Sequence, residues 1–208
     1  MKNNYTFTSE SVSAGHPDKV ADQISDAVAT YLINKNIAHR AAVETLVTTN
    51  MVTLAGEYKS DKFDKHIIED IVRETVKNIG YEQDGFHWKN LSFDSSGVHS
   101  QSADIAMGVD ASGNKDQGAG DQGIMFGYAC KETEDLMPAP IYYSHKILRL
   151  MAEDRKNGNL KGIEPDSKSQ VTMQYEGDKP VKVTSVVIST QHSKDLNQDK
   201  VKDLIMPY

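Results

Sequence analysis

A histidine, an aspartate and a lysine lie close together in the segment Gly15-His16-Pro17-Asp18-Lys19. A strand-like stretch precedes it and a helical pattern follows, so we predict it at a helix N-terminus. Such an end attracts anions, because backbone N–H groups and the helix dipole face the ligand. His16 and Lys19 could contact a phosphate directly, and Asp18 could do so through Mg²⁺. Alternatively, Asp18 only stabilises the first helical turn and His16 is a surface residue.

A second charged segment, Pro165-Asp166-Ser167-Lys168-Ser169-Gln170, lies ahead of a predicted strand. Asp166 could accept hydrogen bonds from a ribose or an amino group, and Lys168 could reach a phosphate as a point charge. The alternative is an ordinary turn with solvated charges. The spacing alone does not separate these two interpretations.

The segment Gly118-Ala119-Gly120-Asp121-Gln122-Gly123 matches G-x-G-x-x-G, the pattern of dinucleotide-binding loops. That loop requires a strand before it and a helix after it. Here a polar stretch precedes the glycines, and Ile124 to Cys130 has the β-branched and aromatic composition that predicts a strand. The order is inverted, so we reject a dinucleotide site. Asp121 could instead hold an ammonium group, or the glycines could only form a tight turn.

These glycines end a polar loop that we expect from about Gly97 to Gln122. Ordered loops of this length are more often functional than idle, so Gln101 and Asp104 are also candidates for binding a ligand.

Two glutamates, Glu44 and Glu57, lie in strand-like runs on either side of Thr49-Asn50, where we predict a hairpin. A carboxylate in an apolar strand needs a cation or hydrogen-bond donors if it points inward. Alternatively, both glutamates face water.

The elements that would position these residues follow from hydrophobic periodicity. Helical spacing of apolar residues predicts helices from Pro17 to about Asn36, from Ile67 to Ile79 and from Pro140 to Gly158. Further strands are predicted at YTFTSESV, NLSFDSS, SQVTMQY and VKVTSVVIST, and DLNQDKVKDLIMPY begins another helix.

The order of elements is strand, helix, hairpin, helix, strand, and then strand, helix, hairpin. The second set resembles an incomplete copy of the first, which predicts an α+β fold of repeated sheet-plus-helices units. We expect an N-terminal α+β domain at residues 1–112 and an incomplete central α+β domain at residues 113–208. The chain is therefore expected to end within a domain.

The formal net charge of −7 argues against a broad nucleic-acid-binding face. It allows a small anionic ligand, because a few lysines and a bound metal can reverse the local field. The sequence has no apolar signal-peptide core and no run long enough to span a bilayer. We therefore expect a cytoplasmic protein without nucleic-acid or membrane partners.

Six segments, in order, closely resemble the methionine adenosyltransferases, also called S-adenosylmethionine synthetases. The resemblance extends from Phe7 to His192 and is carried by FTSESVSAGHPDKVADQISDAV, GAGDQGIMFGYAC, LMPAPI, RKNG, PDSKSQVT and STQHS. It implies an enzyme that joins ATP and L-methionine. The methionine sulfur attacks C5′ of ATP and displaces triphosphate, which is then hydrolysed to pyrophosphate and phosphate.

The resemblance also implies roles for residues on the ATP side. His16 stabilises the leaving triphosphate beside C5′, and Asp18 is similar to a ligand of Mg²⁺, of which two ions are expected per site. Lys19 belongs to the same ATP-binding signature. Asp166 and Lys168 match an ATP-binding pair, with Lys168 acting on the phosphates.

On the other side of the reaction, Glu44 matches the carboxylate that binds an activating K⁺. Glu57, Gln101 and Asp121 match methionine-binding residues. Active sites of the family form between two subunits, so a homo-oligomer, dimer or tetramer, is expected, with the two groups of residues coming from different chains.

The chain departs from the family pattern in three respects. Ala103 stands where proline is common, and Glu164 stands where arginine is common. Against the family pattern we also expect a third domain to be missing from these 208 residues, together with a glycine-rich segment, an Arg-Lys pair and further metal-binding aspartates. We therefore expect the 208-residue chain alone to be inactive. The alternative function is a non-catalytic module that pairs with a full-length subunit through the hairpin face.

Overall fold

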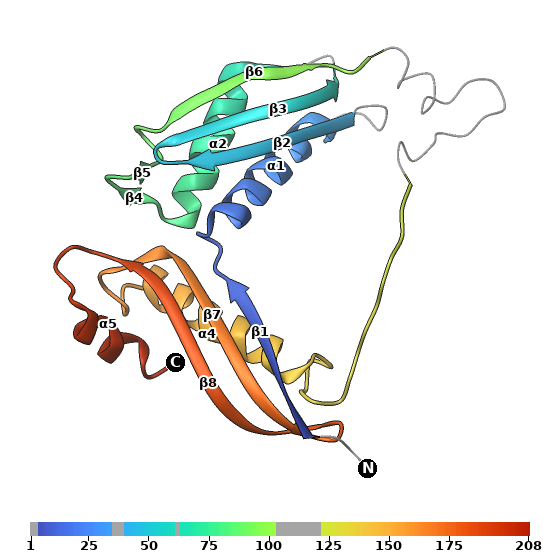
Figure 1. Ribbon diagram of the computed structural model, residues 1–208. Helices are drawn as coiled ribbons and strands as arrows, with labels where there is room; N and C mark the ends of the chain where they lie inside the picture. Colours follow the sequence, from blue (N-terminus) through green and yellow to red (C-terminus); the bar gives the residue numbers. More distant parts are fainter. Residues whose placement is uncertain (1–3, 35–39, 61–62, 103–121) are drawn as a thin grey trace. The chain divides into compact units, whose positions relative to one another are not determined.

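The computed structural model describes residues 4–34, 40–60, 63–102 and 122–208 (Figure 1). They form two compact units, each with a three-stranded sheet. The described parts of Met1–Val20, Val76–Gln83 and Tyr128–Tyr208 make up unit 1, and those of Ala21–Thr75 and Asp84–Gly127 make up unit 2. The predicted α+β class is confirmed. The domain boundary after residue 112 stays a prediction.

Unit 1 contains an antiparallel sheet in the order β1-β7-β8, formed by β1 (Asn4–Val12), β7 (Ile163–Glu176) and β8 (Lys179–His192). Strand β1 pairs with β7 along its whole length, from Asn4 opposite Glu176 to Val12 opposite Lys168. The sequence order had placed β1 with the first repeat. In the structure it pairs instead with β7, a strand of the second repeat. The sequence did not predict this pairing, because an alternating pattern does not specify which strand is the partner.

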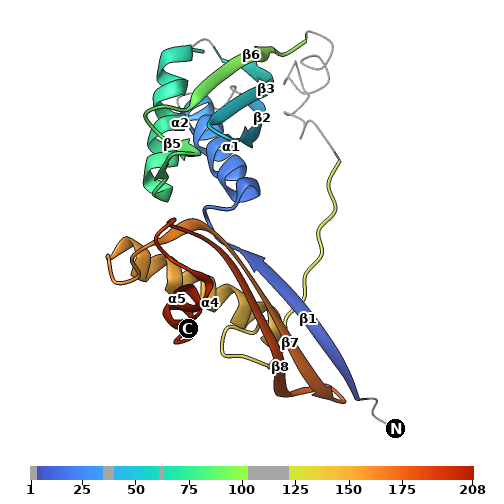
Figure 2. The same cartoon turned by 60° about the vertical axis from the view of Figure 1, so that its left-hand side comes forward.

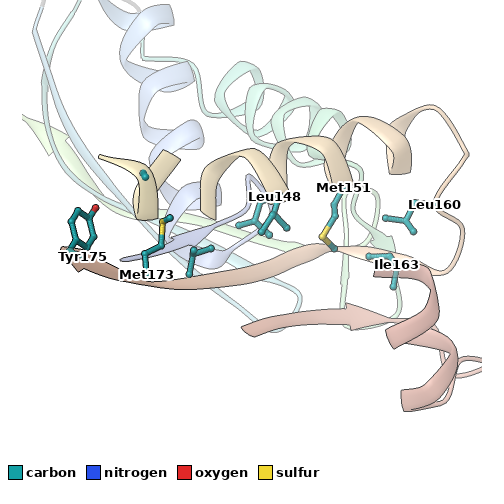
Figure 3. Packing of buried hydrophobic residues seen from close by; sticks show 9 residues of the cluster. Leu148, Met151, Leu160, Ile163, Met173 and Tyr175 are labelled. Carbon is teal, nitrogen blue, oxygen red and sulfur yellow. The ribbon is translucent and has the colours of Figure 1, made fainter. Parts of the chain in front are cut away.

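Helix α4 (Ala139–Lys156) packs on one face of this sheet (Figure 3). Alternate residues of β7 are buried toward the helix, and Leu148 and Met151 of α4 lie over the stretch of β7 between Met173 and Ile163. Burying an apolar side chain of this size contributes about 1.5–3 kcal/mol. Because side chains alternate along a strand, the β7 residues that lie between the buried ones point to the opposite face of the sheet.

Unit 2 contains β2 (Arg40–Thr48), β3 (Met51–Lys59) and β6 (Ser92–Ser100) in the order β2-β3-β6. The first two form the predicted antiparallel hairpin, and β6 runs parallel to β3. Asn50 in the turn has φ 48°, a left-handed conformation that asparagine tolerates. Helices α1 (Pro17–Ile33) and α2 (Lys65–Ile79) cover one face of the sheet (Figure 2).

Both of these helices follow the predicted apolar periodicity. Four residues of α1 and four of α2 are at most 3% exposed: Val20, Ile24, Val28, Leu32, Ile68, Val72, Val76 and Ile79. Helix α2 ends at Gly80, whose φ of 102° suits only glycine. The remaining elements are the paired strands β4 (Glu82–Gln83) and β5 (Phe86–His87) and the helix α5 (Gln198–Ile205). No helix in the described ranges is long and apolar enough to cross a membrane.

The predicted strand from Ile124 to Cys130 is wrong. These residues have no regular secondary structure, and Ile124, Met125 and Phe126 are 80–92% exposed. A strand forms only when a neighbour accepts its backbone hydrogen bonds, and no described strand pairs with this segment. The side-chain pattern reports β propensity and carries no information about the neighbour.

Candidate active site

The segment between β1 and α1 is built as an N-terminal cap. Pro17 occupies the first helical position, where its missing N–H costs nothing. The carbonyl of His16 accepts from the N–H of Val20 at 2.9 Å, and its ring Nδ1 accepts from the N–H of Asp18 at 3.2 Å. Nδ1 needs a lone pair for this bond, so Nε2 carries the ring proton. His16 is thereby available as a donor through Nε2.

Ser13 fastens this segment to β7 by three hydrogen bonds. Its hydroxyl donates to the carbonyl of Pro165 at 2.7 Å and accepts from the N–H of Ser167 at 2.8 Å. Its own N–H donates to the carbonyl of Ser167 at 2.8 Å. Next to it, a Cβ on Gly15 would overlap the backbone of Pro165, so glycine is required there. We call this set of contacts the Ser13 clamp.

The clamp brings together two segments that lie far apart in the sequence, one with His16 and one with Asp166 and Lys168. Asp166 and Lys168 alternate with the buried residues of β7, so both face away from α4. Burial raises the pKa of Asp166, and the nearby charges of His16 and Lys168 offset part of that rise. His16, Asp166 and Lys168 therefore share one electrostatic environment in unit 1.

The carboxylate of Asp166 has unused capacity to bind a ligand. Its Oδ1 is inaccessible to solvent and has no hydrogen-bond partner among the described residues. A buried acceptor without a partner is costly, and such atoms in folded proteins usually have a donor in the functional state. Ribose hydroxyls or an amino group would satisfy it, as the sequence suggested.

Asp18 and Lys19 are placed differently from this trio. The Asp18 side chain is 86% exposed and lies 3.6 Å from Nδ1 of His16. Lys19 lines a cleft of about 640 Å³ formed with β1 and α4. In this cleft Nδ1 of His145 lies 2.6 Å from the hydroxyl of Ser11. Burial is the larger cause that lowers the pKa of His145, and the charge of Lys19 is the smaller one.

Asp18 could supply one carboxylate ligand to Mg²⁺, which is only part of the coordination shell of that ion. No group of three potential metal-ligating side chains occurs in the described parts of the chain. Mg²⁺ commonly takes only one or two carboxylates and completes its octahedron with water and phosphate oxygens. Asp18, exposed beside His16, could therefore serve only together with a phosphate ligand that supplies the remaining oxygens.

Of the residues predicted for the methionine side and for K⁺, those that the structure describes, Glu44, Glu57 and Gln101, lie in unit 2. Glu44 is opposite Ala55 and Glu57 is opposite Ala42, so both glutamates project from the same sheet face. This is the face away from the helices, since neighbouring Val43 is buried. Glu44 is exposed, and one exposed carboxylate would need further oxygen ligands to hold K⁺.

Glu57 has an ionisable neighbour across the sheet. Its Oε1 lies 3.4 Å from Nε2 of His99, which is the residue paired with it on β6. Gln101 follows β6, donates its N–H to the carbonyl of Tyr58 at 2.8 Å, and has a buried Oε1 without a hydrogen-bond partner in the described ranges. The predicted ligand-binding residues Asp104 and Asp121 lie outside the described residues, as does Ala103.

The sequence had not singled out Ser13. Its side chain makes two of the three bonds that hold the catalytic candidates together, and both partners lie more than 150 positions away. A serine before a helix suggests a capping residue at most. No local signal pointed to its partners on β7.

Comparison with known proteins gives consistent matches along the chain. Two family models match: "S-adenosylmethionine synthetase, N-terminal domain" over residues 4–103 and "S-adenosylmethionine synthetase, central domain" over residues 116–208. The chain is 63% identical over 205 residues to the S-adenosylmethionine synthase of Pelagibacter ubique, covering 99% of this chain and 53% of that protein. It is 58% identical over 208 residues to the enzyme of Paramagnetospirillum magneticum, covering 100% and 53%. The chain thus spans about half the length of the curated relatives it matches.

Proposed function

The chain belongs to the S-adenosylmethionine synthetase family, and on this premise we propose that unit 1 binds the triphosphate of ATP in a site that joins ATP to L-methionine. The observation that carries the proposal is the Ser13 clamp. The clamp ties the segment that carries His16 to the part of β7 that carries Asp166 and Lys168, and the charges of His16 and Lys168 act to lower the pKa of Asp166 against the larger effect of burial.

In the proposed reaction the methionine sulfur forms a bond to C5′ of ATP while the bond from C5′ to the triphosphate oxygen breaks. The departing triphosphate takes the electron pair, so negative charge grows on its oxygens. Nε2–H of His16 and the ammonium of Lys168 are the donors in unit 1 that can stabilise this charge. Asp166 would accept hydrogen bonds from the nucleoside.

Mg²⁺ and K⁺ belong to the same proposal. Asp18 would hold Mg²⁺ together with phosphate oxygens, and Glu44 would contribute one ligand to K⁺. When bound, Mg²⁺ neutralises charge on the triphosphate. A cytoplasmic location is likewise proposed.

The proposed partner is a second subunit of the same kind, with a dimer or tetramer as the assembly. The sheet face that carries Glu44 and Glu57 supports this, because the helices among the described residues cover the other face and Leu46 is 64% exposed on this one. A sheet face that no helix covers is available for contact with another chain.

Calorimetric titration of the 208-residue chain with tripolyphosphate and Mg²⁺ tests the proposal. We expect binding that Lys168→Ala weakens by about 10- to 100-fold, the range for a hydrogen bond to a charged group. Lys161→Ala removes another exposed lysine of unit 1 and serves as the charge-matched control. Equal affinities of Lys168→Ala and Lys161→Ala would contradict the proposal.

A second experiment measures the reaction itself. Product is sought by mass spectrometry after incubation of the chain with ATP, L-methionine, Mg²⁺ and K⁺, with His16→Ala beside it. We expect no product from either chain, because loss of a single charge-stabilising donor already costs about 100-fold or more. Product that disappears in His16→Ala would show that the residues present suffice.

A further inference from the structure

A tyrosine outside every motif discussed so far contacts the segment that carries His16. Tyr81 follows α2 directly after Gly80, and its hydroxyl donates a buried hydrogen bond to the carbonyl of Gly15. Tyr81 is only 5% exposed. The accepting carbonyl belongs to the peptide bond that links Gly15 to His16, so the contact acts one bond away from the candidate catalytic residue.

The hydroxyl of Tyr81 remains a donor throughout the physiological range. Burial raises the pKa of Tyr81, and the carboxylate of Asp166 raises it further by disfavouring a second negative charge nearby. This electrostatic effect also means that the phenol lies within reach of the field of Asp166. Tyr81 therefore contacts the Gly15 side of the candidate site through a hydrogen bond.

Tyr81 is itself held in place from α4. The guanidinium of Arg155 donates to the carbonyl of Ile79 at 2.8 Å, which caps the C-terminal end of α2. Gly80 leaves room for this guanidinium, because a Cβ there would collide with it. Burial lowers the pKa of Arg155, and the charge of Glu164 offsets part of that effect. A half-buried side chain of a separate helix thus holds the backbone just before Tyr81.

The Ser13 clamp and Tyr81 act on the same segment from different elements. Ser13 ties it to β7, and Gly15 lies against Pro165 so closely that no side chain fits. The hydrogen bond from Tyr81 to the carbonyl of Gly15 forms only in this conformation of the turn before α1. Together the contacts leave the peptide before His16 with little freedom to rotate.

We propose that Tyr81 is a positioning residue of the triphosphate site: its hydrogen bond to Gly15, supported through Arg155, holds the backbone that carries the His16 ring. This inference rests on the proposed function, because it assigns Tyr81 a part in preparing that site. Tyr81 is not a catalytic residue in this arrangement, since its hydroxyl is bound to the backbone.

The test compares Tyr81→Phe with Tyr175→Phe in the 208-residue chain. Tyr175 is an apt control because it is also buried in unit 1, is 3% exposed, and donates its hydroxyl to Glu132 at 2.7 Å. Both variants lose one buried hydroxyl, so both lose stability. Only Tyr81→Phe removes a contact to the segment before His16.

Two measurements are made on each variant. Calorimetric titration with tripolyphosphate and Mg²⁺ should show affinity about three- to tenfold weaker in Tyr81→Phe, the range for one neutral hydrogen bond, and unchanged in Tyr175→Phe. Hydrogen exchange of the His16 amide, which is bonded to the carbonyl of Ser13 at 3.0 Å, should accelerate several-fold in Tyr81→Phe alone.

The two measurements separate this inference from the proposed function. If the unmodified chain binds no tripolyphosphate, the proposed function fails, and hydrogen exchange alone decides whether Tyr81 orders the segment. Unchanged exchange at His16 in Tyr81→Phe, or equal acceleration in Tyr175→Phe, overturns the inference. Arg155→Lys keeps the charge but not the planar donor, and should change both measurements in the same direction to a smaller extent.

Discussion

The two groups of candidate site residues are held in different ways. In unit 1, Ser13 and Gly15 fix the segment before α1 against β7, so His16 and Asp166 are constrained by contacts between distant parts of the chain. In unit 2, Glu44 and Glu57 stand on an uncovered sheet face. Their position is set by strand register, and the carboxylate of Glu57 adds one 3.4 Å contact with the exposed His99 on β6.

This difference indicates how much of each half is ready to bind. The group in unit 1 has an inaccessible, unpartnered oxygen on Asp166 and a donor on His16, both held by the fold. The group in unit 2 offers carboxylates to whatever covers the sheet. Preorganisation is therefore a property of unit 1, whereas unit 2 depends on a covering partner in the proposed assembly.

Gly15→Ala is the substitution expected to disrupt the preorganised group in unit 1 most strongly. Its Cβ would overlap the backbone of Pro165, which cannot move aside as a side chain could. We expect a loss of about 3 kcal/mol in the free energy of unfolding and loss of tripolyphosphate binding. Urea unfolding measures the first. Gly85→Ala, where a Cβ meets nothing within 4 Å, is the control and should change the stability much less.

Ser13→Ala is the next largest change. It leaves the carbonyl of Pro165 and the N–H of Ser167 without their side-chain partner in a buried position. We expect a loss of about 1–2 kcal/mol, measured by urea unfolding, together with weaker tripolyphosphate binding. Ser25→Ala breaks the 2.8 Å contact between Ser25 and Thr45 in unit 2 instead. Weakened tripolyphosphate binding in that variant too would refute the contrast.

Asp166→Asn should stabilise the chain at neutral pH. Because burial raises the pKa of folded Asp166 above its ordinary value of 3.8, the unfolded chain releases this proton first as pH rises. The free energy of unfolding contributed by this group therefore falls with pH between 3.8 and the raised folded value, and stays low above it. The variant removes that loss, so we expect a melting temperature higher by roughly 2–4 °C.

Asp154→Asn is the matched control for this sign. Hydrogen bonds from Tyr208 and Asn159 lower the pKa of Asp154, so its contribution is present above the ordinary carboxyl pKa and disappears as pH falls. Melting curves from acidic to neutral pH should thus shift in opposite directions for the two variants. A lower melting temperature for Asp166→Asn at neutral pH would show that burial does not destabilise the ionised carboxylate of Asp166 in the folded chain.

Glu57→Gln should have the smallest effect. Its contact with His99 is 3.4 Å long, and the histidine side chain is 65% exposed, so solvent and salt screen it. We expect a change of at most about 0.5 kcal/mol in the free energy of unfolding, vanishing in added salt. A larger loss would mean that unit 2 also carries a preformed charge network.

Local structure was predictable because its causes are local. The i, i+4 spacing from Val20 to Leu32 specified α1, and Gly80 specified the end of α2. The common face of Glu44 and Glu57 also follows from sequence once the turn at Thr49-Asn50 is placed, because a two-residue turn fixes which residues are opposite. The sequence alone could therefore have predicted that Glu44 and Glu57 point to the same face of the sheet.

The remaining features depend on contacts that no local pattern encodes. Nothing near Ser13 specifies Pro165 as its partner, and nothing near Tyr81 specifies Gly15. Ile124 to Cys130 has the composition of a strand but no described neighbour to pair with. The roles of individual site residues stay predictions, since they rest on the family resemblance and on the proposed chemistry.

The pairing of β1 with β7 also sets an order of events during synthesis. Ser13 and Ser167 are 154 positions apart, and a ribosome adds roughly 5–20 residues per second. The N-terminal strand therefore waits on the order of 10–30 s after its own synthesis before its partner emerges. During this interval β1 has no strand to pair with, and an unpaired strand edge on a nascent chain is prone to aggregate, a hazard that chaperones limit.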